Sequence, residues 1–348
     1  MLRKYNLKKN AAFLYSIGPH PTTKSCIESL NIPKSQWYRL TKSNFFSPFS
    51  ELIRSLILAF KIPKYKYYFI EGSIALQIAF FKKFLRREKP IVISRINDDL
   101  FNMDLKKNPI KKFWYKTLIN TLDGAICIAN LVQQEAKKIR PDLPTGIARS
   151  FLHNDDYFFN IKPNFNSKKI LFVGHYRPHK GVENLIKGFL LFHKENPEYE
   201  FILVGRRIPS LRKKFPQKCL HFNDAVFDIV KYSNLFADAK AYLHCPVYEA
   251  GPRTIFESMA CGVIPLVSEM AGNKDLLVDV DKKLILKNNN PEIIAKGLDY
   301  VINLPLKKLK NHSKLCRAVI EKGYTFKKGT DTFKKQVTLL LESIENKK

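Results

Sequence analysis

The chain has 348 residues, 45% of them hydrophobic, which is enough for two domains of ordinary size that each bury a core. No apolar run in the sequence is long enough to span a membrane. The six cysteines are scattered without a C-x-x-C pair, which argues against a disulfide framework and against a zinc site. Free thiols fit a cytoplasmic compartment. The formal net charge of +29 favours an anionic partner such as nucleic acid, a membrane surface or a phosphate-bearing ligand, unless the lysines are merely solvated.

The first part of the chain predicts an alternation of strands and helices. Its basic start is followed by apolar residues without a cleavage site, so we expect a first strand over Asn10–Gly18 and no secretory signal. Short apolar runs indicate further strands at Trp37–Arg39, Tyr65–Ile70, Pro90–Ser94 and Gly124–Ile128. Helices are expected from Thr22 or Thr23 to Leu30, and over Phe113–Leu122 and Asn130–Lys138.

Two segments of this part combine apolar faces with clusters of Lys and Arg. They are Glu51–Lys61 (ELIRSLILAFK) and Ser73–Arg87 (SIALQIAFFKKFLRR). Basic amphipathic helices of this kind can lie in the interface of an anionic membrane. The alternative is that both are buried helices packed on a parallel sheet, and the sequence leaves the two interpretations open.

A segment rich in Asn, Asp and Phe, Asn154–Ser167, predicts a linker, after which a new alternation begins. The expected strands are Ile170–Val173, Phe201–Val204 and Cys219–Phe222, with helices over Val182–Glu195 and up to about Ala237. Such alternation predicts a parallel, Rossmann-like sheet whose ligands bind at the C-terminal ends of its strands.

The most informative stretch is Lys240–Asp275. It predicts a strand over Ala241–Cys245, a polar loop, a helix over Arg253–Cys261 and a second strand over Val263–Val267. Pro252 suits the first position of this helix, and Gly262 suits its C-terminal cap.

The loop and the first helical turn of this stretch carry the chemistry. The free N–H groups of Arg253 and Thr254, with the positive end of the helix dipole, predict an anion site that Gly251 lets a ligand approach. Glu249 and Glu257 frame the site, and carboxylates beside a phosphate site more plausibly accept hydrogen bonds from sugar or ribose hydroxyls. The alternative is that Glu257 pairs with Arg253 one turn away and Glu249 is solvated.

Glu249 and Glu257 are separated by seven residues within the segment EAGPRTIFESMACGVIP. This pattern resembles the signature of the retaining GT-B glycosyltransferases of family 4. The run DGAICIANLVQQEAKK and the last helix, Thr330–Glu345, are also similar to parts of that family. The resemblance implies an α/β GT-B fold with two Rossmann-like domains facing a central cleft. Residues 1–160 would form the acceptor-side domain, completed by the helix 330–348, and residues 166–329 the nucleotide-sugar-binding domain.

The resemblance also assigns roles to residues. It implies that Glu257 holds the nucleotide ribose, that Glu249 contacts the transferred sugar or its reaction centre, and that cations neutralise the departing diphosphate without a metal. The implied catalytic residues are Glu249, Lys180 and Arg177, and the implied donor-binding residues are Glu257, Gly251, Pro252, Arg253, Thr254, His175, Gly18 and Arg206.

The sequence departs from the family pattern at two points. His175 stands where the family has an arginine, with Arg177 as a possible substitute. Many relatives carry a histidine after the strand that corresponds to Pro90–Ser94, whereas here Asn97-Asp98 is nearest, with Arg95 close by.

The function implied is transfer of a hexose, with retention, from a nucleotide diphosphate sugar to a lipid-linked or cell-surface polysaccharide acceptor. The expected enzyme is cytoplasmic, needs no metal cofactor, binds no nucleic acid, and is a candidate for the inner face of an anionic membrane. Alternatives left open are a basic nucleic-acid-binding protein, a GT-B nucleotide-sugar epimerase and an inactive scaffold.

Overall fold

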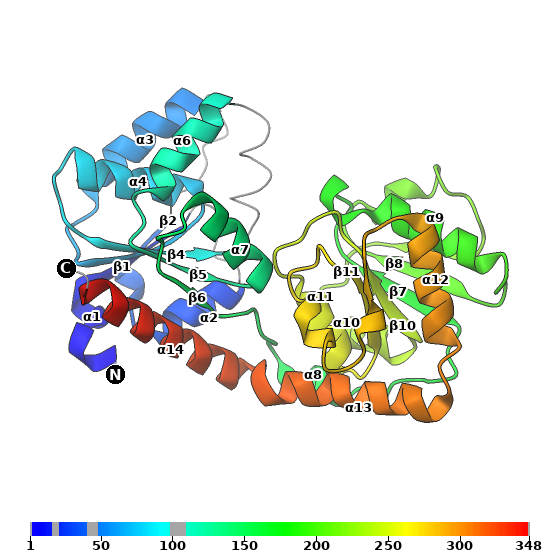
Figure 1. Ribbon diagram of the computed structural model, residues 1–348. Coiled ribbons are helices and arrows are strands. Elements are labelled where there is room, and N and C mark those ends of the chain that lie inside the picture. Colours follow the sequence, from blue (N-terminus) through cyan, green and yellow to red (C-terminus); the bar gives the residue numbers. More distant parts are fainter. Residues whose placement is uncertain (1, 16–20, 40–47, 98–108, 347–348) are drawn as a thin grey trace. The chain divides into compact units, whose positions relative to one another are not determined.

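The computed structural model describes residues 2–15, 21–39, 48–97 and 109–346. The chain folds into two compact units (Figure 1). The first comprises Met1–Ser150 and Gly329–Lys348, and the second comprises Phe151–Lys328. Each unit is built around its own six-stranded parallel sheet, which confirms the expected α/β class.

The first unit has the strand order β2-β1-β3-β4-β5-β6. The strands are β1 (Ala11–Tyr15), β2 (Trp37–Arg39), β3 (Tyr67–Glu71), β4 (Ile91–Ile96), β5 (Gly124–Cys127) and β6 (Thr145–Ile147). The helices are α1 (Leu7–Asn10), α2 (Pro21–Ser29), α3 (Pro48–Lys61), α4 (Ser73–Phe84), α6 (Pro109–Ile119), α7 (Asn130–Ile139) and most of α14 (Phe326–Glu345). Every residue of β4 and β5 is buried, as expected for parallel strands covered on both faces.

Two cations, Lys82 in α4 and Arg86 just after it, join this helix to the end of α3. The Lys82 ammonium is fully buried, donates to the Ile62 carbonyl at 2.8 Å, and lies 3.7 Å from the Glu88 carboxylate. Arg86 lies 3.0 Å from the same carboxylate and donates to the Ala59 carbonyl at 2.9 Å. The two cations therefore satisfy carbonyls that the end of α3 leaves without helical partners.

We expect Lys82→Met to lower the free energy of unfolding by ~3 kcal/mol, because Glu88 would remain buried after losing the Lys82 ammonium beside it. Burial lowers the pKa of Lys82 from 10.5 to about 8. Between pH 8 and pH 10.5, Lys82 is therefore protonated in the unfolded chain and has lost its proton in the folded chain. Stability of the wild type should therefore rise relative to the variant as the pH increases from 8 to 10.5. Urea unfolding at several pH values measures both effects, with the exposed Lys64→Met as control. Equal stability of both variants would contradict the structural role.

The second unit has the strand order β12-β11-β10-β7-β8-β9. The strands are β7 (Lys169–Val173), β8 (Glu200–Val204), β9 (Leu220–Asn223), β10 (Ala241–His244), β11 (Ile264–Ser268) and β12 (Ile285–Leu286). The helices are α8 (Asp155–Phe159), α9 (Val182–His193), α10 (Ile229–Ala237), α11 (Arg253–Ala260), α12 (Pro291–Ile302) and α13 (Leu306–Gly323). All strands expected from apolar runs are confirmed in both units, with ends that differ by a few residues. The end of the first expected strand, beyond Tyr15, lies outside the described residues.

The segment Asn154–Ser167, expected to be a linker, instead belongs to the second unit and contains α8. The side chains of Phe158 and Ile161 are buried in the core of this unit, where α8 packs against α10 and α11. The Asn and Asp residues that suggested a linker include Asn154 at the helix N-cap position and two acids in its first turn, where negative charge is favourable.

Candidate functional site

The site lies at the point of the second sheet where the strand order reverses. From β7 the chain proceeds outward to β8 and β9, and then returns to place β10 on the other side of β7. The loops that follow β7 and β10 therefore leave the same sheet edge in opposite directions, and ligands of open α/β sheets bind in this kind of crevice.

Backbone contacts hold these two loops together. The amide of Val247 donates to the carbonyl of His179 at 2.9 Å. Gly181 has φ of +65°, and a Cβ atom there would lie 3.1 Å from the carbonyl oxygen of Cys245. The glycine after Lys180 is therefore required by both its conformation and the close approach of the second loop.

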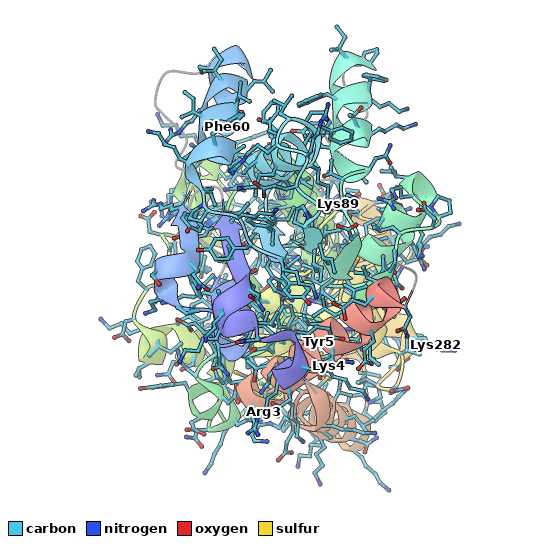
Figure 2. All side chains as sticks on the ribbon, turned by 90° about the vertical axis from the view of Figure 1, so that its left-hand side faces the viewer. Arg3, Lys4, Tyr5, Phe60, Lys89 and Lys282 are labelled. Atoms are coloured by element: carbon cyan, nitrogen blue, oxygen red, sulfur yellow. The ribbon has the colours of Figure 1, made fainter. Side chains whose placement is uncertain are left out.

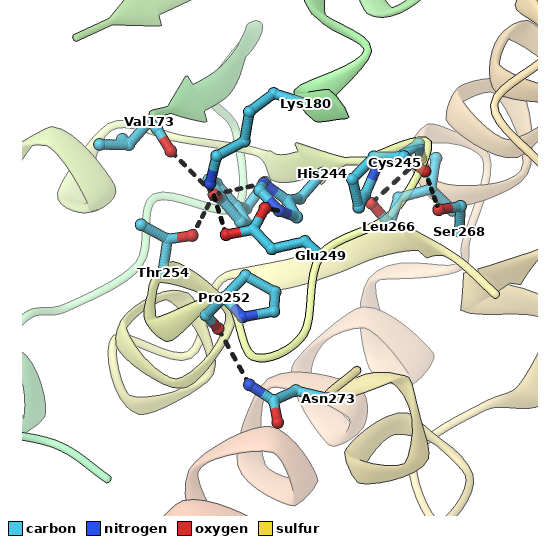
Figure 3. Close-up of polar contacts among 12 residues, drawn as sticks. Val173, Lys180, His244, Cys245, Glu249, Pro252, Thr254, Leu266, Ser268 and Asn273 are labelled. Atoms are coloured by element: carbon cyan, nitrogen blue, oxygen red, sulfur yellow. Dashed lines mark hydrogen bonds and ion pairs between the residues drawn. The ribbon is translucent and has the colours of Figure 1, made fainter. Parts of the chain in front are cut away.

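This arrangement brings Lys180 and Glu249 together, as Figure 3 shows. The ammonium of Lys180 donates to one oxygen of Glu249, and the other oxygen lies 2.8 Å from Nε2 of His244. Glu249 lies between the two groups, and its backbone is fixed by hydrogen bonds to Met270 and Gly272. The structure thus joins two of the expected catalytic residues and adds His244, which the sequence analysis did not identify.

A buried hydrogen-bond chain continues from His244 to the helix α11 (Figure 3). Nδ1 of His244 lies 3.1 Å from the hydroxyl of Tyr242, and that hydroxyl lies 2.5 Å from the hydroxyl of Thr254. Because Glu249 accepts, Nε2 of His244 must carry a proton. The Tyr242 hydroxyl donates to the Thr254 hydroxyl, which connects the chain to the first turn of α11. The chain fixes the direction of the Glu249 carboxylate.

The electrostatics of the site keep Glu249 ionised. Burial by itself raises the pKa of this carboxyl, but His244 and Lys180 outweigh it and lower the pKa to about 2. At neutral pH Glu249 is therefore a fixed carboxylate with a cation on one side, suited to accept a hydroxyl hydrogen bond or to oppose developing positive charge.

Glu257 has a different environment, one turn inside α11. It is buried, and the Tyr232 hydroxyl donates to its Oε2 at 2.6 Å. Burial raises the pKa of Glu257, and Arg253 acts in the opposite direction. Within the described part of the chain, no ion pair joins Arg253 to Glu257, so the pairing considered as an alternative is replaced by the contact with Tyr232.

The first turn of α11 lies as expected, with one correction. The helix begins at Arg253, so Pro252 occupies the cap position and not the first helical position. Arg253 and Thr254 are half-buried in the first turn, next to the half-buried Gly251. Gly262 has φ of +74° and ends the helix, as the sequence predicts.

The remaining expected cations gather in the loops after β7 and β8. The Tyr176 amide donates to the Arg206 carbonyl at 3.0 Å, which ties these loops together. His175 is exposed, and its pKa is lowered by partial burial and by the charges of Arg177, Arg206 and Lys180. These charges therefore act on one region, and this concentration of positive charge favours an anion there.

Arg177 does not join Glu249. It lines an adjacent cavity of about 300 Å³ together with Tyr176, Pro178, Gly181, Val182, Glu183, Asn184, Val247 and Asn289. Arg206 packs over the ring of Phe227, which is 77% exposed and which the sequence analysis did not identify. Gly18 and Asp98 lie outside the described residues. Among the residues that the structure describes, no cluster of three His, Cys, Asp or Glu side chains can hold a metal ion.

A polar cluster occupies the corresponding reversal point of the first unit, between β1 and β3. Asn97 donates to Glu71 at 2.5 Å and to Thr23 at 2.6 Å, and Thr23 donates to Glu71 at 3.2 Å. The three side chains come from the C-terminal ends of β3 and β4 and from the start of α2. Arg95, one strand position from this edge, is buried and lies over the ring of Phe333 in α14.

Comparison with known proteins identifies the family of the second unit. Residues 154–326 match the family model "Glycosyl transferases group 1". An uncharacterized glycosyltransferase of Methanocaldococcus jannaschii is 27% identical over 184 residues, 50% of this chain and 46% of that protein. One of Haemophilus influenzae is 31% identical over 151 residues, 42% of each chain. The alignments thus span just under half the length of these curated relatives.

Solved structures match nearly the whole chain in fold. A UDP-forming trehalose-phosphate synthase from Burkholderia xenovorans has a TM-score of 0.73 at 11% identity, covering 95% of this chain and 99% of that one. HepE of Anabaena, solved with UDP and glucose, has a TM-score of 0.70 at 16% identity, covering 98% and 94%. With its two parallel sheets and its family match over residues 154–326, the chain belongs to the glycosyl transferases group 1 family and has a GT-B-type fold.

Proposed function

We propose that the protein is a retaining glycosyltransferase that moves a hexose from a nucleotide diphosphate sugar to a lipid-linked or cell-surface polysaccharide acceptor. The observation that carries the proposal is the Glu249 carboxylate, held between Lys180 and His244 at the reversal point of the second sheet. A carboxylate in this position, beside a helix N-terminus and several cations, suits a ligand that has both hydroxyl and phosphate groups.

The donor is proposed to bind across the second unit. Glu257 accepts from the ribose hydroxyls, while the N–H groups at the start of α11, the cations Lys180 and Arg177 and the His175 ring face the diphosphate. As the glycosidic bond breaks, negative charge grows on the leaving diphosphate, and preorganised positive groups stabilise it. These side chains supply the required charge without a metal ion. Glu249 orients the sugar, and Arg206 lies at the nucleotide end.

The acceptor is proposed to bind the first unit, where the cluster of Thr23, Glu71 and Asn97 offers hydroxyl, carboxylate and amide groups at a strand edge that suits ligands. The first unit, Met1–Ser150 with Gly329–Lys348, would then be the acceptor-side domain, and the second unit, Phe151–Lys328, the donor domain. We further propose that the protein works in the cytoplasm and meets its acceptor at an anionic membrane surface.

Thermal unfolding with a panel of nucleoside diphosphates and nucleotide sugars tests the donor site. A ligand at 100 times its dissociation constant stabilises the folded state by ~2.7 kcal/mol, because it binds the folded chain and not the unfolded one. We expect nucleotides of one base to raise the melting temperature by a few degrees. A well-folded sample whose melting temperature no member of the panel changes would contradict the proposal.

A further inference from the structure

Seven large apolar side chains form an exposed patch on three helical segments of the first unit. The patch, called the α3–α6 patch below, consists of Ile53, Ile57 and Phe60 on α3, Phe84 and Leu85 at the end of α4, and Ile110 and Phe113 on α6. The exposed fractions are 58% for Phe60, 61% for Phe84 and 73% for Phe113, so these side chains extend into solvent and do not complete the core of the unit.

The three helices that carry the patch lie side by side. The helix α4 packs against both α3 and α6, and Figure 1 shows the three grouped on one side of the first unit. The ring of Phe80 lies 4.6 Å from that of Phe84 and 5.4 Å from that of Trp114, so aromatic contacts connect α4 to α6. On α3, Ile53, Ile57 and Phe60 follow helical spacing along one stripe, while Ser55 and Ala59 are buried.

Positive charge surrounds this patch. The exposed cations of the same segments are Lys61, Lys64, Arg87, Lys89, Lys112 and Lys116. Residues 48–64, 84–89 and 109–120 contain two acidic residues, Glu51 and Glu88, and Glu88 is buried against Lys82 and Arg86. Phe60 and Lys89 are labelled on the side of the first unit seen in Figure 2.

The combination of apolar side chains and lysines indicates which kind of partner binds the α3–α6 patch. The cores of protein–protein interfaces are depleted in lysine, whereas a bilayer interface accommodates apolar side chains below the headgroups and lets lysines reach the phosphates. No described helix is long and apolar enough to cross a membrane. We propose that the α3–α6 patch docks the protein on the surface of a bilayer that contains anionic lipids. This inference deepens the membrane part of the proposed function and is independent of donor binding.

Flotation with lipid vesicles tests the proposal. Wild-type protein should bind vesicles of phosphatidylcholine with about one third phosphatidylglycerol at low salt and much less at 0.5 M salt, because screening shortens the reach of the charges. Each basic residue near an anionic surface strengthens binding roughly fivefold, so the triple variant Lys61→Gln, Lys89→Gln, Lys116→Gln should bind roughly 100-fold more weakly. The triple variant Phe60→Ser, Phe84→Ser, Phe113→Ser should lose binding at low salt as well.

Matched controls are available in the second unit and on α14. One control variant changes three exposed lysines together to Gln: Lys213, Lys218 and Lys296. A second changes two exposed leucines to Ser: Leu306 and Leu339. Both control variants should bind vesicles as the wild type does. The patch variants should keep the wild-type melting temperature and its shift by nucleotide, which separates this proposal from the donor site. Absence of vesicle binding by the wild type, equal binding to pure phosphatidylcholine, or equal losses in the controls would overturn the proposal.

Discussion

Replacing Lys180 with methionine is expected to lower kcat by ~10²–10³-fold, because removing one preorganised donor to a developing negative charge typically costs this much. The ammonium also holds Glu249, whose pKa of about 2 depends on Lys180 and His244. Without Lys180 the carboxylate keeps one partner, His244, and loses its fixed position. Methionine retains most of the volume of the side chain, so the loops after β7 and β10 should remain in contact.

The measurement is kcat at saturating donor, once the nucleotide panel has identified the donor. Lys187→Met is the matched control, since Lys187 is exposed on the helix that follows the same loop. Control activity should stay within twofold of the wild type. A Lys180→Met enzyme as active as this control would refute the role of Lys180 in charge stabilisation.

Replacing Glu257 with alanine is expected to abolish the nucleotide-induced rise in melting temperature. Hydrogen bonds to a charged group are worth ~1.5–3 kcal/mol each, so loss of two from the ribose hydroxyls would weaken donor binding roughly 100-fold or more. Glu257→Ala also leaves the buried hydroxyl of Tyr232 without its acceptor, which should lower stability by ~1–3 kcal/mol.

A second variant separates the loss of binding from the loss of stability. Glu257→Gln keeps an acceptor for Tyr232 and removes the charge, so it should fold like the wild type and still show a reduced nucleotide shift. Glu195→Ala, an exposed acid after α9, serves as the control and should behave as the wild type. An unchanged donor affinity in folded Glu257→Gln and Glu257→Ala would remove Glu257 from the donor site.

Much of the second unit could be predicted from the sequence because its information is local. Parallel strands that are buried on both faces appear as short apolar runs, and β7, β8, β10 and β11 all show this pattern. The helix α11 was predictable from Pro252 before it and Gly262 after it, since both residues have restricted or special backbone conformations. Glu249 and Glu257 were identified by their spacing around this helix.

The residues that the sequence analysis missed depend on distant partners. His244 lies in a strand whose residues are all buried, and a single histidine there is typical of a core residue. Tyr232 lies on a different helix from Glu257 and has no local relation to it. The linker expected at Asn154–Ser167 was wrong for the same reason, because only packing against α10 and α11 makes α8 part of the second unit.

The sequence by itself thus determined most of the strands, the helices α9 and α11, the α/β class, the family signature around Glu249 and Glu257, and the basic amphipathic character of α3 and α4. Only the tertiary structure decided which partners these groups meet. The order of the strands placed β10 beside β7, which brought Lys180 and His244 to Glu249, and the packing of α3, α4 and α6 decided which apolar side chains remain exposed. Helix ends and burial patterns are set by neighbours in sequence, whereas strand order and helix packing depend on contacts between residues far apart in the chain.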